Sequence, residues 1–134
     1  MKKKKSLRDA VLKYALEQYG TAPEYPFDGS PDIAILRHTA GNKWYGAIMS
    51  VPKSKFGFPD NKSVDILNVK CDPVMSGSIR LNDGIYPAYH MNKQHWISIL
   101  LDGTVDMAMI EMLTDTSYIL TARKVKKSSA KQDT

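Results

Sequence analysis

Two histidines, two aromatic rings, a lysine and an asparagine occur within ten residues, Pro87 to Trp96, directly before the apolar run Ile97 to Leu101. Lysine and asparagine can contact a nucleic-acid backbone, and aromatic rings can stack on exposed bases. The alternative is structural, because His90 and Asn92 can hydrogen-bond their own turn and Trp96 can belong to the core. The candidate binding residues of this segment are Tyr89, His90, Asn92, Lys93 and His95.

A second candidate lies in the segment KSKFGFP, in which two phenylalanines follow closely after two lysines. Such rings at the tip of a loop either fold back onto the protein or meet a partner. The candidate residues here are Lys53, Lys55, Phe56 and Phe58.

Catalytic and metal sites have weaker support in the sequence. The spacing of Cys71, His90 and His95 fits no metal signature, and no phosphate-binding glycine loop is present. Cys71 precedes a predicted helix, where the helix dipole lowers a thiol pKa, so a cysteine nucleophile paired with a histidine is the alternative. Because no third orienting residue is evident, we predict no catalytic residue, no metal and no cofactor.

Three helices are predicted. A capping-box sequence and an apolar stripe predict the first over Leu7–Tyr19, and an N-cap aspartate followed by proline predicts the second over Pro73–Leu81. Thr104 is the predicted N-cap of the third. The segment Ser117–Val125 alternates like a strand but is interpreted as helix.

Five apolar runs predict strands, separated by a tight hairpin at Thr39–Asn42 and by a longer wing at Pro52–Lys62. The predicted strands are Ile33–His38, Lys43–Val51, Ser63–Val69, Ile85–Tyr89 and Trp96–Leu101.

The charge is unevenly distributed along the 134 residues. Size and a hydrophobic content of 43% predict one domain, residues 6–122, with basic tails at 1–5 and 123–134, the latter having the composition of a disordered segment. Nine of the 19 basic residues lie in the tails against one acid, Asp133, whereas residues 6–122 carry a net charge of −3. Basic tails attract phosphate without sequence preference, or are simply solvated.

The single cysteine cannot form an internal disulfide, and no secretory leader follows the first lysines. No apolar run reaches the roughly 18 residues that a membrane span needs. We therefore expect a cytoplasmic protein without a membrane partner.

Several short stretches resemble the MmcQ/YjbR family, namely NVKCDP at Asn68–Pro73, PAYHMNKQHW at Pro87–Trp96 and the pair Ser117-Tyr118. Pro26-Phe27 and the hairpin Gly41–Tyr45 extend the resemblance over nearly the whole chain. The resemblance implies a single α+β domain of order α-β-β-β-α-β-β-α, with helices packed on an antiparallel sheet, comparable to secretion chaperones and described as a double wing. It also implies a role in DNA binding.

Two functions are therefore expected. The first is weak, salt-dependent binding of DNA or RNA through the wing loops and the basic tails. The alternative is a protein-interaction or chaperone-like module, which would use a sheet face or the third helix and have no nucleic-acid role.

Overall fold

The computed structural model describes residues 6–122, and both predicted basic tails lie outside the described residues. Within them, three α-helices, five β-strands and one short 3-10 helix confirm the predicted α+β order. The bounds are α1 Leu7–Tyr19, β1 Ala34–Arg37, β2 Trp44–Pro52, η1 Lys53–Phe56, β3 Ser63–Lys70, α2 Pro73–Ile79, β4 Ile85–Pro87, β5 Trp96–Leu100 and α3 Met107–Thr121.

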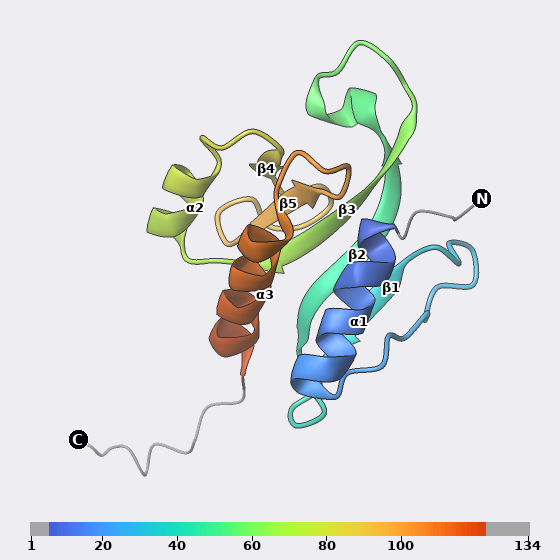
Figure 1. Cartoon of the computed structure of the whole chain (residues 1–134), viewed down its shortest axis with the longest axis vertical. Coiled ribbons are helices and arrows are strands. Elements are labelled where there is room, and N and C mark those ends of the chain that lie inside the picture. The colour runs from blue at the N-terminus through green and yellow to red at the C-terminus, as the bar shows by residue number, and fades with distance from the viewer. Residues whose placement is uncertain (1–5, 123–134) are drawn as a thin grey trace.

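The strands form one antiparallel sheet in the spatial order β1-β2-β3-β5-β4. β1, β2 and β3 follow one another as neighbours, whereas α2 and β4 are inserted before β5 returns to pair with β3 (Figure 1). β4 is therefore an edge strand, although it precedes β5 in the chain.

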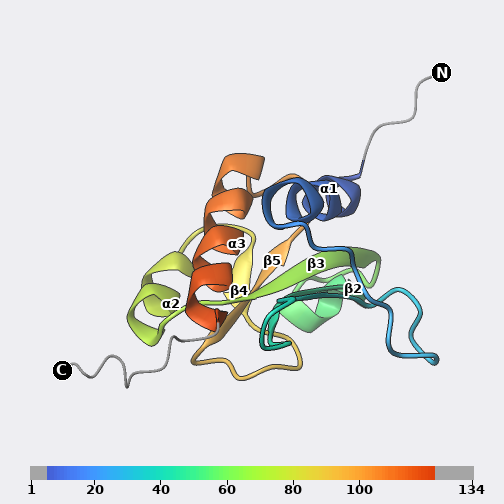
Figure 2. The same ribbon diagram turned by 90° about the horizontal axis from the view of Figure 1, so that it is seen from below.

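Helices α1 and α3 cover one side of the sheet, which we call the helix face (Figure 2). α1 begins where Ser6 Oγ accepts a hydrogen bond from Asp9 N at 3.1 Å, and it ends at Gly20, whose φ is 69°. Its buried side is the predicted stripe with Val11 and Ala15. The large side chains buried on the helix face include Leu36, Tyr45, Ile48, Leu67, Ile97, Ile99, Ile110 and Leu113.

A bulge in β2 decides which way Tyr45 points. Leu36 of β1 pairs with Gly46, but Arg37 pairs with Trp44, so Tyr45 is the extra residue. This shift puts Trp44 on the opposite side of the sheet and buries Tyr45 completely under the helices. A Cβ at position 46 would lie 3.1 Å from Leu36 Cδ1, so the close approach of the two strands favours glycine there.

The opposite side of the sheet, the loop face, carries a second apolar cluster made of Ile35, Ala47, Met49, Val51, Val64, Ile66 and Leu100. Two connections cover it: the β2–β3 connection, which contains η1, and the β4–β5 connection, residues 88–95 (Figure 2). They leave the sheet from opposite ends, since Pro52 pairs with Ser63 at one end and Lys70 with Trp96 at the other. Both then fold back under the same face.

Helix α3 begins later than the sequence predicted. The backbone N of Thr104 donates to Asp102 Oδ1 at 2.9 Å within a turn, and Asp106 is the N-cap, its Oδ1 accepting from Met109 N at 2.9 Å. The prediction of Thr104 as the cap is wrong, because aspartate is an equally good or better cap and its charge is favoured beside the helix N-terminus. The ambiguous segment 117–125 is helical to residue 121, and residues 123–125 lie outside the described part.

Two other elements end earlier than predicted. α2 stops at Ile79, and Leu81 lies 85% exposed in the turn that follows. β4 stops at Pro87, because the backbone N of Tyr89 donates to the Ser98 side chain instead of to a strand neighbour.

Candidate functional site

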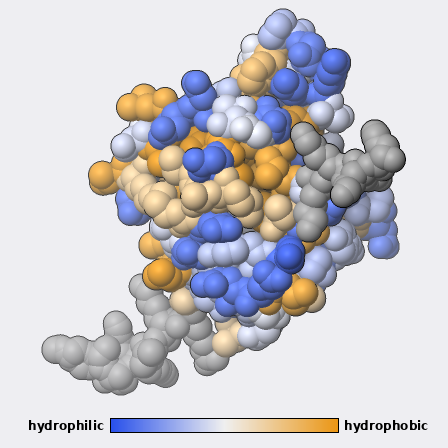
Figure 3. Space-filling view, in the orientation of Figure 1, coloured by the Kyte–Doolittle hydropathy of each residue, from blue (hydrophilic) through white to orange (hydrophobic). Residues whose placement is uncertain are grey.

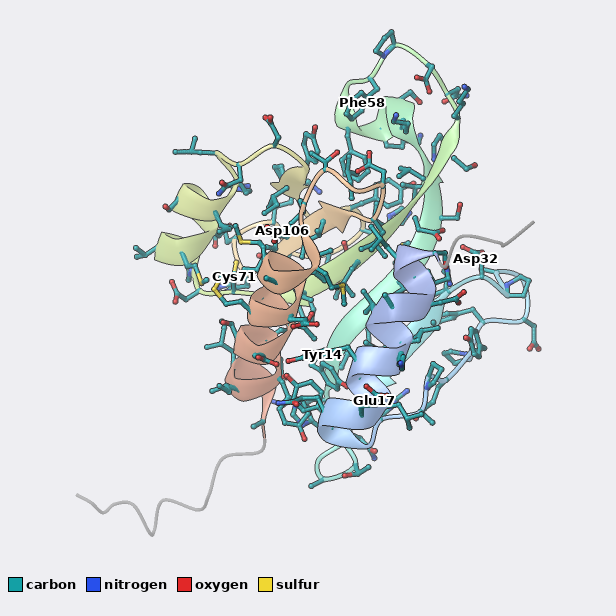
Figure 4. All side chains as sticks on the ribbon, in the orientation of Figure 1. Tyr14, Glu17, Asp32, Phe58, Cys71 and Asp106 are labelled. Carbon is teal, nitrogen blue, oxygen red and sulfur yellow. The ribbon has the colours of Figure 1, made fainter. Side chains whose placement is uncertain are left out.

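The two phenylalanines of the β2–β3 connection fold back onto the sheet. The Phe56 ring centroid lies 5.1 Å from that of Tyr86 and 6.3 Å from that of Tyr89, and Phe58 lies 6.2 Å from Tyr86. Lys53 Nζ lies 4.9 Å from the centroid of the Phe58 ring. Phe58 is labelled beside η1 in Figure 4. Both rings are half-buried and therefore contribute to the fold, and only their remaining surface is open to a partner.

A pair of buried polar residues fixes the β4–β5 connection. Asn68 and Ser98 pair across β3 and β5 and are fully buried. Asn68 Nδ2 donates to Tyr89 O at 3.0 Å, Ser98 Oγ accepts from Tyr89 N at 2.9 Å, and Ser98 Oγ also donates to Asn68 Oδ1. Both backbone polar groups of Tyr89 are thus held by the sheet, which places its ring over the loop face.

The two candidate segments meet around one open hollow of about 300 Å³, which we call the basic aromatic hollow. Lys55 and Phe56 reach it from one connection, Tyr89 and Lys93 from the other, and Tyr86 of β4 lies with them. Four of the nine residues predicted as site residues are therefore brought together.

Both lysines of this hollow are available to an anion. Lys93 Nζ donates to Ala88 O at 2.8 Å, which holds the ammonium in place and leaves two of its three donors for a ligand. Within residues 6–122, neither Lys55 nor Lys93 forms an ion pair with a carboxylate. The hollow therefore combines aromatic surface with uncompensated positive charge.

Lys53 and Phe58 line a different hollow of about 410 Å³, together with Asp83 and Asp102. Its two carboxylates outnumber its single lysine, so this hollow does not favour phosphate. The structure thus separates these two residues from the other wing candidates.

The remaining candidates have other surroundings. The His90 ring centroid lies 3.9 Å from that of Tyr89, and His90 lines a separate apolar pocket. Asn92 Oδ1 accepts from Gln94 N at 2.8 Å and from His95 N at 3.3 Å, which makes Asn92 a turn-forming residue. His95 lines none of these hollows.

Cys71 lies directly ahead of α2 and is 1% exposed (Figure 4). Burial raises the pKa of its thiol, which outweighs the opposite influence of a hydrogen bond with Ser76. A buried, protonated thiol is a poor nucleophile, so this geometry argues against the cysteine-dependent alternative.

We expect the Cys71→Ser variant to keep any binding activity of the protein and to lose about 1 kcal/mol of stability, because a hydroxyl replaces an apolar buried group. Thermal unfolding and oligonucleotide affinity, measured side by side with Cys71→Ala, check this. An activity abolished in both variants while circular dichroism shows a folded protein would make Cys71 a functional group.

A second polar cluster joins α1 to α3. Asp115 Oδ1 accepts a hydrogen bond from the Tyr14 hydroxyl at 2.8 Å and another from the Tyr19 hydroxyl, and Figure 4 shows Tyr14 between the two helices. Tyr19 stacks on Tyr118 with ring centroids 3.9 Å apart. Burial, followed by the hydrogen bond to Asp115, raises the pKa of Tyr14 to about 12 and also raises that of Tyr19. The cluster holds the helices together with neutral tyrosines.

His38, at the end of β1, is buried beside this cluster, with its ring centroid 4.2 Å from that of Tyr118. Thr121 Oγ1 donates to Ser117 O, so it accepts from His38 Nε2, 2.8 Å away. Burial lowers the pKa of His38 below 6.5.

Protonating His38 therefore favours the unfolded state. Its contribution to stability is present above pH 6.5 and is lost as the pH falls through the lower pKa of the folded protein. We expect the melting temperature to fall from pH 7.5 to about pH 5.5, and to fall less in His38→Gln. The wild-type protein, measured in parallel, is the reference. Equal slopes for the wild type and His38→Gln would contradict the assignment.

Asn68, Ser98 and Asp115 were not among the site residues predicted from the sequence. A usable signal was present for the first two, because each is a polar residue inside an apolar strand and such residues need a partner. Asp115 gives a similar signal on α3, where it lies one turn before Tyr118.

Within residues 6–122, no three or more His, Cys, Asp or Glu side chains gather where they could hold a metal ion. No helix in the same range has both the length and the apolar character required to cross a membrane.

Comparisons with known proteins agree with the fold and the residue pattern. The chain is 45% identical over 114 residues to the uncharacterized protein YyaQ of Bacillus subtilis, which covers 85% of this chain and 97% of that protein. It is 29% identical over 133 residues to the uncharacterized protein YbdF of Escherichia coli O157:H7, covering 96% and 95%.

Solved structures show the same architecture. The crystal structure of a Pseudomonas syringae protein matches with a TM-score of 0.84 and 42% identity, over 86% of this chain and 98% of that chain. A Deinococcus radiodurans protein with a DUF419 domain matches in fold, with a TM-score of 0.68 and 23% identity over 95% and 87%. The family model described as YjbR matches residues 16–120. This chain therefore belongs to the YjbR family.

Proposed function

We propose that the protein binds single-stranded DNA or RNA weakly through the basic aromatic hollow. The observation that carries this is the position of Lys55 and Lys93 around the half-buried rings of Phe56, Tyr86 and Tyr89. Lysines neutralise phosphates, and exposed aromatic surface stacks on bases for about 1–3 kcal/mol per base. The arrangement supplies both contacts within one hollow.

The shape of the hollow favours a single strand over a duplex. Sequence-reading of a duplex uses a helix or a β-ribbon that projects into the major groove, whereas this surface is concave. A base can reach the rings only when it is unpaired. The net charge of −3 on residues 6–122 opposes nucleic acid at long range, so affinity should be weak and depend on the tails.

We expect Lys55→Ala with Lys93→Ala to weaken binding of a thymidine oligonucleotide and to reduce its salt slope by about 1.4, at roughly 0.7 per phosphate contact on a single strand. Fluorescence anisotropy over a salt series measures both effects. Lys13→Ala with Lys43→Ala removes two lysines that do not line the hollow and should leave the slope close to that of the wild type. Equal slopes for the two double variants would contradict the proposal.

The same assay separates the hollow from the tails. Removing residues 1–5 and 124–134 should lower the salt slope further, because these segments carry most of the surplus positive charge. Affinity that survives this trimming supports the hollow, and complete loss of affinity would assign binding to the tails alone.

A protein-interaction role is the second candidate, and the surface formed by α2 and the turn after it favours it. Val74 and Leu81 are each 85% exposed, an unusual state for two large apolar residues close together in the chain. Figure 3 shows apolar surface on the helix-face side, reaching the edge of the molecule where α2 lies in Figure 1. Absence of oligonucleotide binding at low salt would favour this function.

A further inference from the structure

The apolar pocket beside His90 is separate from the basic aromatic hollow and has a volume of about 170 Å³. Its walls come from the loop before β1, from β1 and β2, and from the β4–β5 connection. They include Phe27, Ile33, Trp44, Ala47, Met49 and His90.

The chemistry of these walls selects an apolar ring. His90 is the one side chain among its lining residues with a titratable group. A nucleobase would lose hydrogen bonds from its edge donors and acceptors here, and unpaired buried polar groups are unfavourable. An apolar cavity of about 150 Å³ accommodates benzene, so the size fits one six-membered ring.

The walls of the pocket are held in place by the sheet and by contacts among the lining side chains. The β2 bulge sets Trp44 on the loop face, and the Phe27 ring lies edge-on to it at 6.3 Å. His90 adopts a φ of 64°, which is uncommon for a residue other than glycine, and it follows Tyr89, whose backbone the sheet fixes. Backbone conformations of this kind persist where the surroundings determine them, often at ligand sites.

A polar depression of about 190 Å³ adjoins this pocket, sharing His90, Ile33 and Met49 with it. It adds Asp32, whose Oδ2 accepts from Ser50 N at 2.8 Å, and Figure 4 labels this residue near the start of α1. A ring held in the apolar pocket can therefore direct a substituent towards the Asp32 carboxylate.

Arg8, which contacts Asp32, does not cancel the charge of its carboxylate. Arg8 donates to the Asp32 backbone O at 2.7 Å, but its guanidinium makes two hydrogen bonds of 3.1 Å to the Asp65 carboxylate. These three side chains carry a net charge of −1. The depression therefore favours a cation over an anion.

We propose that this pocket binds a small molecule with a single aromatic ring and a short amine-bearing arm, the ring against Trp44 and Ala47 and the ammonium towards Asp32. Ligands of this size have few atoms, so dissociation constants should be roughly millimolar. The site attracts the opposite charge from the basic aromatic hollow and does not depend on nucleic-acid binding.

Three ligands of nearly equal shape test the charge preference at pH 8: benzylamine, benzyl alcohol and benzoate. We expect benzylamine to bind about threefold more tightly than benzyl alcohol, the factor that one exposed charge pair gives, and benzoate to bind least. Trp44 fluorescence and the NMR shift of the Ala47 methyl group report binding in the wild-type protein. Benzoate binding as well as benzylamine, or an unmoved Ala47 methyl signal, would overturn the proposal.

Variants test the position. Ala47→Ile should fill the pocket and abolish binding of both benzylamine and benzyl alcohol. Asp32→Asn, which keeps an acceptor for Ser50 N, should remove only the preference for benzylamine, and Asp28→Asn is the matched control that keeps it. Lys55→Ala with Lys93→Ala should leave benzylamine affinity unchanged. The proposals for this site and for the nucleic-acid site can therefore be refuted independently of each other. Should Ala47→Ile not fold, the Ala47 methyl shift in the wild type remains decisive.

Discussion

Replacing Phe56 and Phe58 together with alanine is expected to destabilise the protein by about 3 kcal/mol and to lower its melting temperature by about 10 °C. Removing two fully buried phenylalanines would cost more stability, but these rings are only half-buried against Tyr86 and Tyr89. The loss arises from uncovering the apolar cluster of the loop face, which no long helix shields within the described chain. Thermal or urea unfolding measures it.

Phe27→Ala is the matched control, since Phe27 is 41% exposed and has its aromatic contact with Trp44 instead. Phe27→Ala should lower the stability of the protein by less than half as much as the double substitution does. The double variant should also bind oligonucleotide more weakly, because part of the hollow is lost. Weaker binding at unchanged stability would contradict the packing of the two rings and make them dedicated ligand contacts.

The Asn68→Ala variant is expected to lose about 2–3 kcal/mol of stability, since it leaves the part-buried Tyr89 carbonyl without its donor and the Ser98 hydroxyl without its acceptor. The effect should be concentrated in residues 88–95. Hydrogen exchange of the Tyr89 amide should accelerate more than that of amides in α1, and oligonucleotide affinity should fall because Lys93 is no longer held at the hollow.

Asn61→Ala provides the comparison, because Asn61 is an exposed asparagine in the β2–β3 connection. It should change stability by under about 0.5 kcal/mol. If Asn68→Ala is no less stable than Asn61→Ala, the buried pair does not fix the connection.

Local sequence signals predicted most elements of the fold. Ser6 and Asp72 cap α1 and α2 as expected, since an N-cap depends on a few neighbouring residues. The error at α3 arises where Asp106 and Thr104 both offer a cap, because the aspartate is the better cap and Thr104 belongs to the preceding turn, where its backbone N donates to Asp102.

The site was less accessible to prediction because it depends on long-range geometry. The sequence identified Lys55 and Lys93 in two separate segments, but not that both segments fold under one face. That outcome requires the strand order, in which β5 returns to β3, and the polar pair Asn68 and Ser98, which draws the β4–β5 connection onto the sheet. Neither follows from the pattern of a single segment.

The hydrogen bonds from Tyr14 and Tyr19 to Asp115 join the first helix of the described chain to the last. During synthesis on the ribosome, α1 and the β1–β2–β3 meander emerge well before α3, so the apolar side of the growing sheet lacks its second helix until Met107–Thr121 has been made. Premature termination before Met107 would leave that surface permanently open to other chains. A chain that stops between β5 and α3 would therefore carry all five strands with one apolar side uncovered, which makes it more prone to aggregation than a chain that stops earlier.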